Sequence, residues 1–214
     1  MKLDIAVWRG GKMSTQDNHI IQWPDGRVRC RWCNPQNPLY IAYHDAEWGV
    51  PCHDDQRLFE MLVLEGFQAG LSWECVLNKR EGFRQAFDGF NPLVIARYPD
   101  EKLEALRHDS RIIRNKLKIR AARTNARVFL AIQAEWGCFD AYLWHWTQGK
   151  VICEQGCTRS LLSDQISADL KKRGMTFVGT TIIYAYLQAM GVICSHEEGC
   201  WKQGQHAEDR PVCP

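Results

Sequence analysis

Long apolar runs are missing from this chain of 214 residues. No stretch approaches the roughly 18 consecutive apolar residues of a membrane-spanning helix, so we expect no membrane partner. The first residues, MKLDIAVWRGGKM, also lack the basic segment, apolar stretch and cleavage site of a secretory signal. The composition, 45% hydrophobic and 24% charged, is that of a soluble globular protein with one domain or two small lobes. Together these features predict a cytoplasmic protein.

A large net charge is absent as well. The formal charge is only +2, so composition alone does not indicate a polycation that binds nucleic acid. The distribution is more informative, because residues 111–127 contain seven Lys or Arg and no carboxylate. A second basic group, Lys171, Lys172 and Arg173, follows later in the chain. A local basic surface on a nearly neutral protein suits a polyanion that docks on one side.

Internal repeats and alternating strand patterns are not found, and the fold is predicted to be all-α. Weak periodicity and several turn signals over 1–28 predict a loosely packed N-terminal extension, followed by a domain over 29–204 and a tail over 205–214. Asp54 or Asp55 as a cap predicts a helix over 55–69, and Ser72 as a cap predicts the next over 73–87. Hydrophobic spacing predicts further helices over 117–136, 163–174 and 180–191, a short apolar segment over 139–146, and helix starts at Pro92 and Asp100. In the helix over 117–136, the side opposite the basic residues should include Leu117, Ala121, Val128 and Ala131.

The ten cysteines are scattered through a chain long enough to fold without disulfides, so metal ligation and burial are the better interpretations. Two thiolates and two imidazoles, a sufficient set for tetrahedral zinc, are Cys30, His44, His196 and Cys200. Taken alone, each Cys and His pair is weak evidence. Cys33 forms a rival CxxC with Cys30, Cys52 and His53 lie nearby, and buried thiols with surface histidines would give the same spacing.

Glu65 has the spacing of a buried carboxylate. It follows Leu58, Met61 and Leu62 by seven, four and three positions, so it shares their apolar helix face. An unpaired carboxylate there costs several kcal/mol, and it must have a partner. Either Glu65 makes a hydrogen bond or ion pair near a helix end, or it faces a ligand in a cleft.

Aromatic residues are dense around the same region of the sequence. The set is Trp32, Tyr40, Tyr43, Trp48 and Trp73, in a chain with nine tryptophans. Aromatic side chains mostly fill cores, which is the simpler interpretation. A pocket with planar walls, a carboxylate and a phenol would also suit an extruded nucleobase.

The stretch FVGTT, residues 177–181, contains a glycine turn that opens a helix. The first N–H groups of a helix can bind a phosphate, and the basic residues Lys171 to Arg173 lie just before this turn. A plain turn between two helices is the alternative.

Three blocks in the same order resemble the bacterial 3-methyladenine DNA glycosylase I family. They are RCRW followed by PLYIAYHDAEWGVP, then LFEMLVLEGFQAGLSW, and finally KKRGMTFVGTTIIYAYLQAMG followed by His196-x3-Cys200. The resemblance runs from about Arg29 to Cys200. It implies an all-helical glycosylase fold with a helix-hairpin-helix element, whose two chain ends are joined by zinc.

The resemblance also implies roles for the candidate residues. One structural zinc would be bound by Cys30, His44, His196 and Cys200. The base pocket would be lined by Trp32, Tyr40, Tyr43, Trp48, Glu65 and Trp73, with Glu65 and Tyr43 reading the purine edge while Trp73 stacks on its face. DNA phosphates would be bound by Lys171, Gly179 and Thr180.

The implied activity is hydrolytic removal of 3-methyladenine from alkylated double-stranded DNA by a monomer. Methylation at N3 makes the adenine cationic, so the base leaves as a neutral molecule and a strong general acid is unnecessary. The catalytic aspartate usual in the superfamily is absent from this family. The pocket blocks place no lysine for a Schiff base, so strand cleavage is not expected.

Two alternatives to a DNA glycosylase belong to other functional classes. A zinc-stabilised nucleic-acid-binding protein without activity would fit a missing Glu65 or a filled pocket. A zinc hydrolase would need an open metal position with bound water, whereas two Cys and two His close the coordination shell.

Overall fold

The computed structural model describes residues 23–205 and is almost entirely helical there. The elements are α1 Pro38–Ala46, α2 Asp55–Gln68, α3 Trp73–Leu77, α4 Arg80–Ala86, the 3-10 helix η1 Asp88–Phe90, α5 Pro92–Ile95, α6 Asp100–Leu106, α7 Lys116–Trp136, α8 Phe139–His145, β1 Ile152–Cys153, α9 Leu161–Lys172, α10 Thr180–Ala189 and β2 Ile193–Cys194. The all-α prediction is confirmed in that the fold is mostly helical, and the short strands β1 and β2 were not predicted. None of the helices in this part of the chain is long and apolar enough to cross a membrane.

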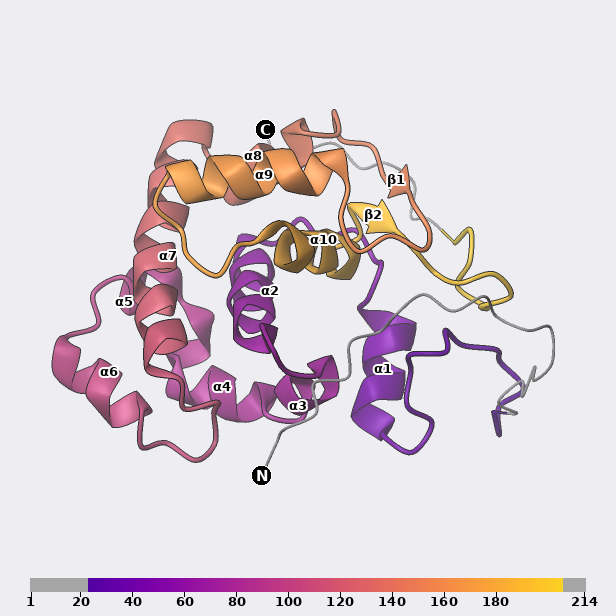
Figure 1. The fold of residues 1–214 in the computed structure, drawn as a ribbon, viewed down its shortest axis with the longest axis horizontal. Helices are drawn as coiled ribbons and strands as arrows, with labels where there is room; N and C mark the ends of the chain where they lie inside the picture. Colours follow the sequence, from indigo (N-terminus) through magenta and orange to yellow (C-terminus); the bar gives the residue numbers. More distant parts are fainter. Residues whose placement is uncertain (1–22, 206–214) are drawn as a thin grey trace, which may run out of the picture.

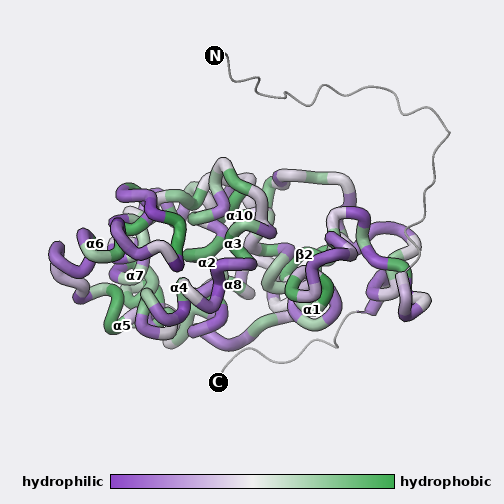
Figure 2. Tube along the Cα trace, turned by 90° about the horizontal axis from the view of Figure 1, so that it is seen from below, coloured by the Kyte–Doolittle hydropathy of each residue, from purple (hydrophilic) through white to green (hydrophobic). Residues whose placement is uncertain are grey.

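Helices α2 and α10 pack against each other in the middle of the molecule (Figure 1). Helix α9 lies on α10, while α7 contacts α2, α5, α6 and α8. Hydropathic colouring shows apolar stretches along α2 and α10 and hydrophilic ones around α6 (Figure 2). The two central helices therefore supply a rigid, buried frame from which side chains can be presented to a site.

The predicted caps of the early helices are confirmed, but one predicted helix is divided. Asp54 accepts from the N–H of Arg57 at the start of α2, and Ser72 accepts from that of Cys75 at the start of α3. The expected single helix over 73–87 is wrong, because the N–H of Lys79 bonds to the carbonyl only three residues back. This tighter turn lets α4 start in a new direction, with Arg80 buried.

The predicted apolar face of α7 is partly wrong. Leu117 is 64% exposed and Ala131 is exposed, whereas Lys118 is only 7% exposed. The Lys118 ammonium donates to the carbonyls of Phe67, at 2.9 Å, and Ala69, at 2.6 Å, at the end of α2. Free carbonyls at a helix end attract a cation, and this contact turns Lys118 inward and Leu117 outward.

The two ends of the described chain meet on one side of the molecule. Strands β1 and β2 form a parallel pair, and the N–H of Trp201 donates to the carbonyl of Val28 at 2.8 Å. Trp23 is buried, with the Arg29 guanidinium 4.5 Å above its ring. The predicted loose packing is therefore wrong at Trp23, whereas the side chains of residues 24–28 are exposed. Residues 1–22 and 206–214, the rest of the predicted extension and tail, lie outside the described residues.

Candidate functional site

A pocket of about 180 Å³ opens between α1, α2, α3 and α10. Its lining residues are Trp32, Tyr40, Tyr43, Trp48, Glu65, Gln68, Trp73, Ala185 and Gln188. The structure thus brings together all six residues predicted for a base pocket. Drug-sized ligands usually occupy roughly 300–1,000 Å³, so this volume suits a single heterocycle.

Three lining residues were missed by the sequence analysis. Gln68 follows Glu65 by one helical turn, a spacing that offered a signal for the same face of α2. Ala185 and Gln188 lie one turn apart on α10, in a stretch whose sequence marks only a buried helix. Their place in the pocket depends on the packing of α10 against α2.

Glu65 is a buried residue of the pocket lining, and none of the residues in the described part of the chain forms an ion pair with it. Glu65 is only 3% exposed. No described residue makes a hydrogen bond to its Oε2. Burial raises the pKa of the Glu65 carboxyl to about 8. In the free pocket Glu65 therefore holds its proton at neutral pH, and a cationic or hydrogen-bond-donating ligand would favour the ionised carboxylate.

The pocket walls are aromatic rings held by contacts among themselves. The Tyr43 and Trp73 ring centres are 5.2 Å apart, and Trp32 is 5.4 Å from Tyr40 and 4.9 Å from Trp48. Burial, with Glu65 as the next cause, raises the pKa of the Tyr43 phenol well above its usual value. The phenol therefore keeps its proton and can donate a hydrogen bond into the pocket.

The four predicted metal ligands form one buried group. The possible ligand atoms of Cys30, His44, His196 and Cys200 all lie within 4.8 Å of one another. The Cys200 Sγ lies 3.4 Å from His44 Nε2 and 3.6 Å from His196 Nδ1. A tetrahedral zinc with ordinary bond lengths separates sulfur and nitrogen ligands by about 3.5 Å, so these donors fit such an ion.

Neighbouring groups orient the metal-ligand cluster. His44 turns its Nδ1 to Asp45, at 2.8 Å, which leaves Nε2 facing the sulfur atoms. Burial opposes ionisation of Asp45, but hydrogen bonds from Arg29 and His44 lower its pKa to about 2. The carboxylate therefore stays charged and fixes the tautomer of His44.

The rival metal ligands lie elsewhere. Cys33 points its thiol at the carbonyl of Tyr40, and Cys52 at that of Asp54. His53 contacts Asp140 at 2.9 Å. Among the described residues only one cluster of three or more potential ligands is found, and Cys30 rather than Cys33 belongs to it.

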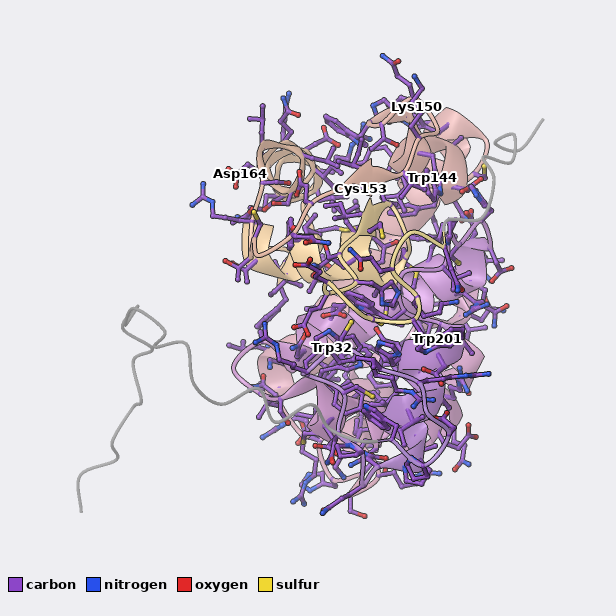
Figure 3. The ribbon with its side chains drawn as sticks, turned by 90° about the vertical axis from the view of Figure 1, so that its right-hand side faces the viewer. Trp32, Trp144, Lys150, Cys153, Asp164 and Trp201 are labelled. Atoms are coloured by element: carbon purple, nitrogen blue, oxygen red, sulfur yellow. The ribbon has the colours of Figure 1, made fainter. Side chains whose placement is uncertain are left out.

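The cluster and the pocket share a wall. The His196 ring meets Trp48 edge to face at 4.7 Å, and the His44 ring lies 5.1 Å from Trp32. A Cβ at Gly49 would come within 2.9 Å of His196 Nε2, so only glycine allows this approach. Figure 3 looks onto this side of the molecule, where Trp32 and Trp201 are labelled. Ordering the metal ligands therefore also orders two pocket rings.

The predicted phosphate-binding residues lie on either side of the connection between α9 and α10. The Thr180 hydroxyl is 2.8 Å from that of Ser163, at the opposite end of α9 from Lys171. Lys171 is exposed in the last turn of α9, Gly179 precedes the first residue of α10, and Thr180 begins that helix. No side chain caps the N–H groups at this helix start. Arg173 is engaged by Glu135 and Asp169, so the free charge of this basic group resides on its lysines.

The basic segment 111–127 is less available than predicted. Lys118 is buried, Arg123 binds Asp100 and the carbonyl of Tyr98, and Arg127 binds the carbonyl of Ala96. Arg111 pairs with Asp109. Among the described residues, the exposed cations of the segment whose side chains make neither an ion pair nor a hydrogen bond are Arg114, Lys116 and Arg120. Most of this segment thus holds helices together.

Fold and site together define a helical protein in which a small aromatic pocket lies beside a buried cluster of two Cys and two His that could hold a metal ion. Residues 32–203 match the family model of methyladenine glycosylase. The DNA-3-methyladenine glycosylase 1 of Escherichia coli is 46% identical over 178 residues, which cover 80% of this chain and 95% of that protein. The DNA-3-methyladenine glycosylase of Haemophilus influenzae is 40% identical over 179 residues, covering 81% and 96%.

Solved structures agree with these relatives. A crystal structure of 3-methyladenine DNA glycosylase I is similar with a TM-score of 0.78 at 45% identity, over 81% of this chain and 98% of that one. A variant of 3-methyladenine DNA glycosylase I in complex with 3-methyladenine also has a TM-score of 0.78, at 31% identity, over 80% and 96%. The chain therefore belongs to the methyladenine glycosylase family.

Proposed function

We propose that the protein is a DNA repair enzyme that extrudes 3-methyladenine from alkylated double-stranded DNA and hydrolyses its N-glycosyl bond. The observation that carries the proposal is the buried Glu65 carboxylate, without a partner at Oε2, in an aromatic pocket. Such a group costs stability unless a ligand compensates for it. Family membership and the named relatives supply the reaction.

The pocket recognises the base by its positive charge, by hydrogen bonds to the purine edge and by stacking on the ring face. The Glu65 carboxylate accepts from the adenine amino group and attracts the cationic ring, while the protonated Tyr43 donates to the purine edge. Trp73 stacks on the base, and Trp32, Tyr40 and Trp48 complete the walls. A normal adenine lacks the positive charge and is held less well.

Bond breaking then follows from the lesion. The methylated base leaves as a neutral molecule, and an oxocarbenium-like sugar develops near the carboxylate, which stabilises it. A water molecule completes the hydrolysis. No lysine lines the pocket, in the part of the chain that the structure describes, so a Schiff base and strand cleavage are not part of this mechanism.

DNA docks on the turn between α9 and α10, which would be the helix-hairpin-helix element of the glycosylase superfamily. The N–H groups at Gly179 and Thr180, which no side chain caps, would bind one phosphate. Lys171, exposed in the last turn of α9, would add positive charge to the docking surface. These contacts carry no base specificity, so readout of flanking sequence should be weak. The enzyme would act as a cytoplasmic monomer.

A structural zinc would be held by Cys30, His44, His196 and Cys200. Two thiolates and two imidazoles complete a tetrahedral shell, so the ion would stabilise the joined chain ends and would offer no position for a reactive water. This donor set favours a structural ion over the metal of a hydrolase.

The test is to incubate the protein with methylated DNA and identify the released bases. Release of 3-methyladenine, with the strand left intact, is expected. Tight binding of methylated DNA without release would identify a non-enzymatic binding protein instead. Release of other alkylpurines alone would refute the proposed substrate.

A further inference from the structure

Two buried polar side chains of α7 contact both functional parts of the molecule. Lys118 and Asn125 lie seven positions apart, so they share one face of α7 about two turns apart. They are 7% and 4% exposed. Burying two such side chains is unfavourable unless their hydrogen bonds are satisfied, so their partners indicate what they do.

Lys118 holds the end of α2. Its ammonium donates to the carbonyls of Phe67 and Ala69, at 2.9 and 2.6 Å. These carbonyls lie within one turn of Glu65 and on either side of Gln68, both of which line the pocket. The position of this last turn, and hence of the carboxylate, is therefore set partly from α7.

Asn125 holds the turn between α9 and α10. Its Nδ2 donates to the carbonyl of Thr176 and its Oδ1 accepts from the N–H of the same residue, both at 2.9 Å. The next residue, Phe177, has a φ of +56°, which side chains other than glycine rarely adopt. The two hydrogen bonds of Asn125 hold the chain beside this unfavourable conformation.

The turn also touches α2 directly. A Cβ built on Gly66 would lie 3.5 Å from both the Cβ and the carbonyl oxygen of Phe177. The space left between Gly66, Phe177, Lys118 and Asn125 is about 10 Å³. That is about the room of one water molecule, so a shift of the turn is passed to the helix that carries Glu65.

We infer that Lys118 and Asn125 are positioning residues for base excision, which hold the phosphate-binding turn and the base pocket at a fixed separation. The inference rests on the proposed function. A nucleotide whose backbone is anchored at the turn reaches the pocket only if that separation is right. Small misplacement at an active site can reduce a rate by as much as roughly a hundredfold without any loss of binding.

The experiment measures single-turnover release of 3-methyladenine from methylated DNA over a range of enzyme concentrations. Lys118→Met removes the ammonium but keeps most of the side-chain volume. Lys118→Arg is the conservative variant, because a guanidinium can donate to the same two carbonyls. Lys102→Met is the matched control, since this lysine of α6 contacts Asp88 and Tyr98 and neither α2 nor the turn.

We expect Lys118→Met to lower the saturated rate roughly tenfold to a hundredfold while the half-saturating enzyme concentration stays within about twofold. Lys118→Arg should recover most of that rate, and Lys102→Met should match the parent. An unchanged saturated rate in Lys118→Met, or an equal loss in Lys102→Met, would overturn the inference. A parent that releases no base would overturn the proposed function instead.

Asn125→Asp provides a second route if Lys118→Met does not fold. The carboxylate still accepts from the N–H of Thr176 but can no longer donate to its carbonyl. We expect the same pattern, a lower saturated rate at unchanged DNA affinity. A parent-like saturated rate in folded Asn125→Asp would overturn the role of the turn contact.

Discussion

The metal-ligand cluster and the base pocket lie side by side, yet their buried polar groups are treated differently. In the cluster, His44 faces both a sulfur atom and Asp45, and Asp45 is in turn bonded by Arg29 and Trp201. In the pocket, Oε2 of Glu65 has no described partner and its pKa is raised to about 8. Satisfied polar groups stabilise a structure, whereas an unsatisfied one is tolerated where a ligand completes it. His44 and Asp45 are therefore held by protein groups, whereas Oε2 of Glu65 is left for a ligand. Within the cluster, Nε2 of His196 is the atom that likewise has no hydrogen-bond partner among the described residues.

Metal removal should have the largest effect. We expect one zinc per chain, and its removal by a chelator should lower the unfolding temperature by more than about 10 °C, because buried thiols and imidazoles lose their common partner. Elemental analysis and thermal unfolding measure both quantities. Cys33→Ser is the matched control and should keep its metal. A stable metal-free protein, or loss of zinc from that control, would contradict the assignment.

The pH dependence of the free energy of unfolding should reveal the buried Glu65 carboxyl. Burial raises the pKa of Glu65 from 4.5 to about 8, so the folded protein holds this proton more tightly than the unfolded chain. The resulting stability is fully present below about pH 4.5 and is lost as the pH rises through about 8.

Glu65→Gln has no such proton. Its stability relative to the parent should therefore increase by roughly 2 to 4 kcal/mol between about pH 5 and pH 9. Urea unfolding of both proteins across this range provides the measurement. If the difference in the free energy of unfolding between the two proteins stays constant with pH, then Glu65 has a hydrogen-bond partner or counter-ion in solution.

The same substitution should slow catalysis. We expect Glu65→Gln to bind DNA nearly as well as the parent but to release 3-methyladenine roughly tenfold to a hundredfold more slowly, because a neutral amide loses a charge-assisted bond worth about 1.5 to 3 kcal/mol. It should also select less sharply against normal adenine. Single-turnover release with enzyme in excess measures the rate.

Glu74→Gln is the control for that experiment. The Glu74 carboxylate lies next to Trp73 in the chain but already accepts from Asn34 and Asn37, at 2.8 and 2.7 Å. Its replacement should leave the release rate near that of the parent. Equal rates for the parent and folded Glu65→Gln would mean that recognition has been placed on the wrong residue.

The smallest expected effect concerns the exposed charges. Affinity for DNA should fall steeply with salt, and Lys171→Ala should reduce the slope of log affinity against log salt by about one, as the loss of one phosphate contact requires. Arg123→Gln, which removes a cation already paired with Asp100, should leave the slope unchanged. A fluorescence anisotropy titration at several salt concentrations measures both, and a flat salt dependence would remove the electrostatic part of the proposed docking.

Local features of the structure could be predicted where the interactions are short in sequence. Asp54 and Ser72 cap helices through bonds to N–H groups three residues ahead, and the spacing of Glu65 from Leu58, Met61 and Leu62 predicted its burial. The division between α3 and α4 could not be predicted, because Arg80 turns inward to reach Glu60 on α2. Helical propensity carries no information about that distant partner.

The candidate site shows the same division. The sequence by itself determined the kinds of side chain available, namely two thiols, two imidazoles, a carboxylate on an apolar face and a group of aromatic rings. Only the tertiary structure decided that Cys30 and not Cys33 joins the cluster, that Gln188 reaches the pocket, and that Lys118 is buried. Residue type and periodicity determine structure only over a few neighbouring residues. The partners of a buried charge come from segments of the chain that are far apart in the sequence and meet only in the folded structure.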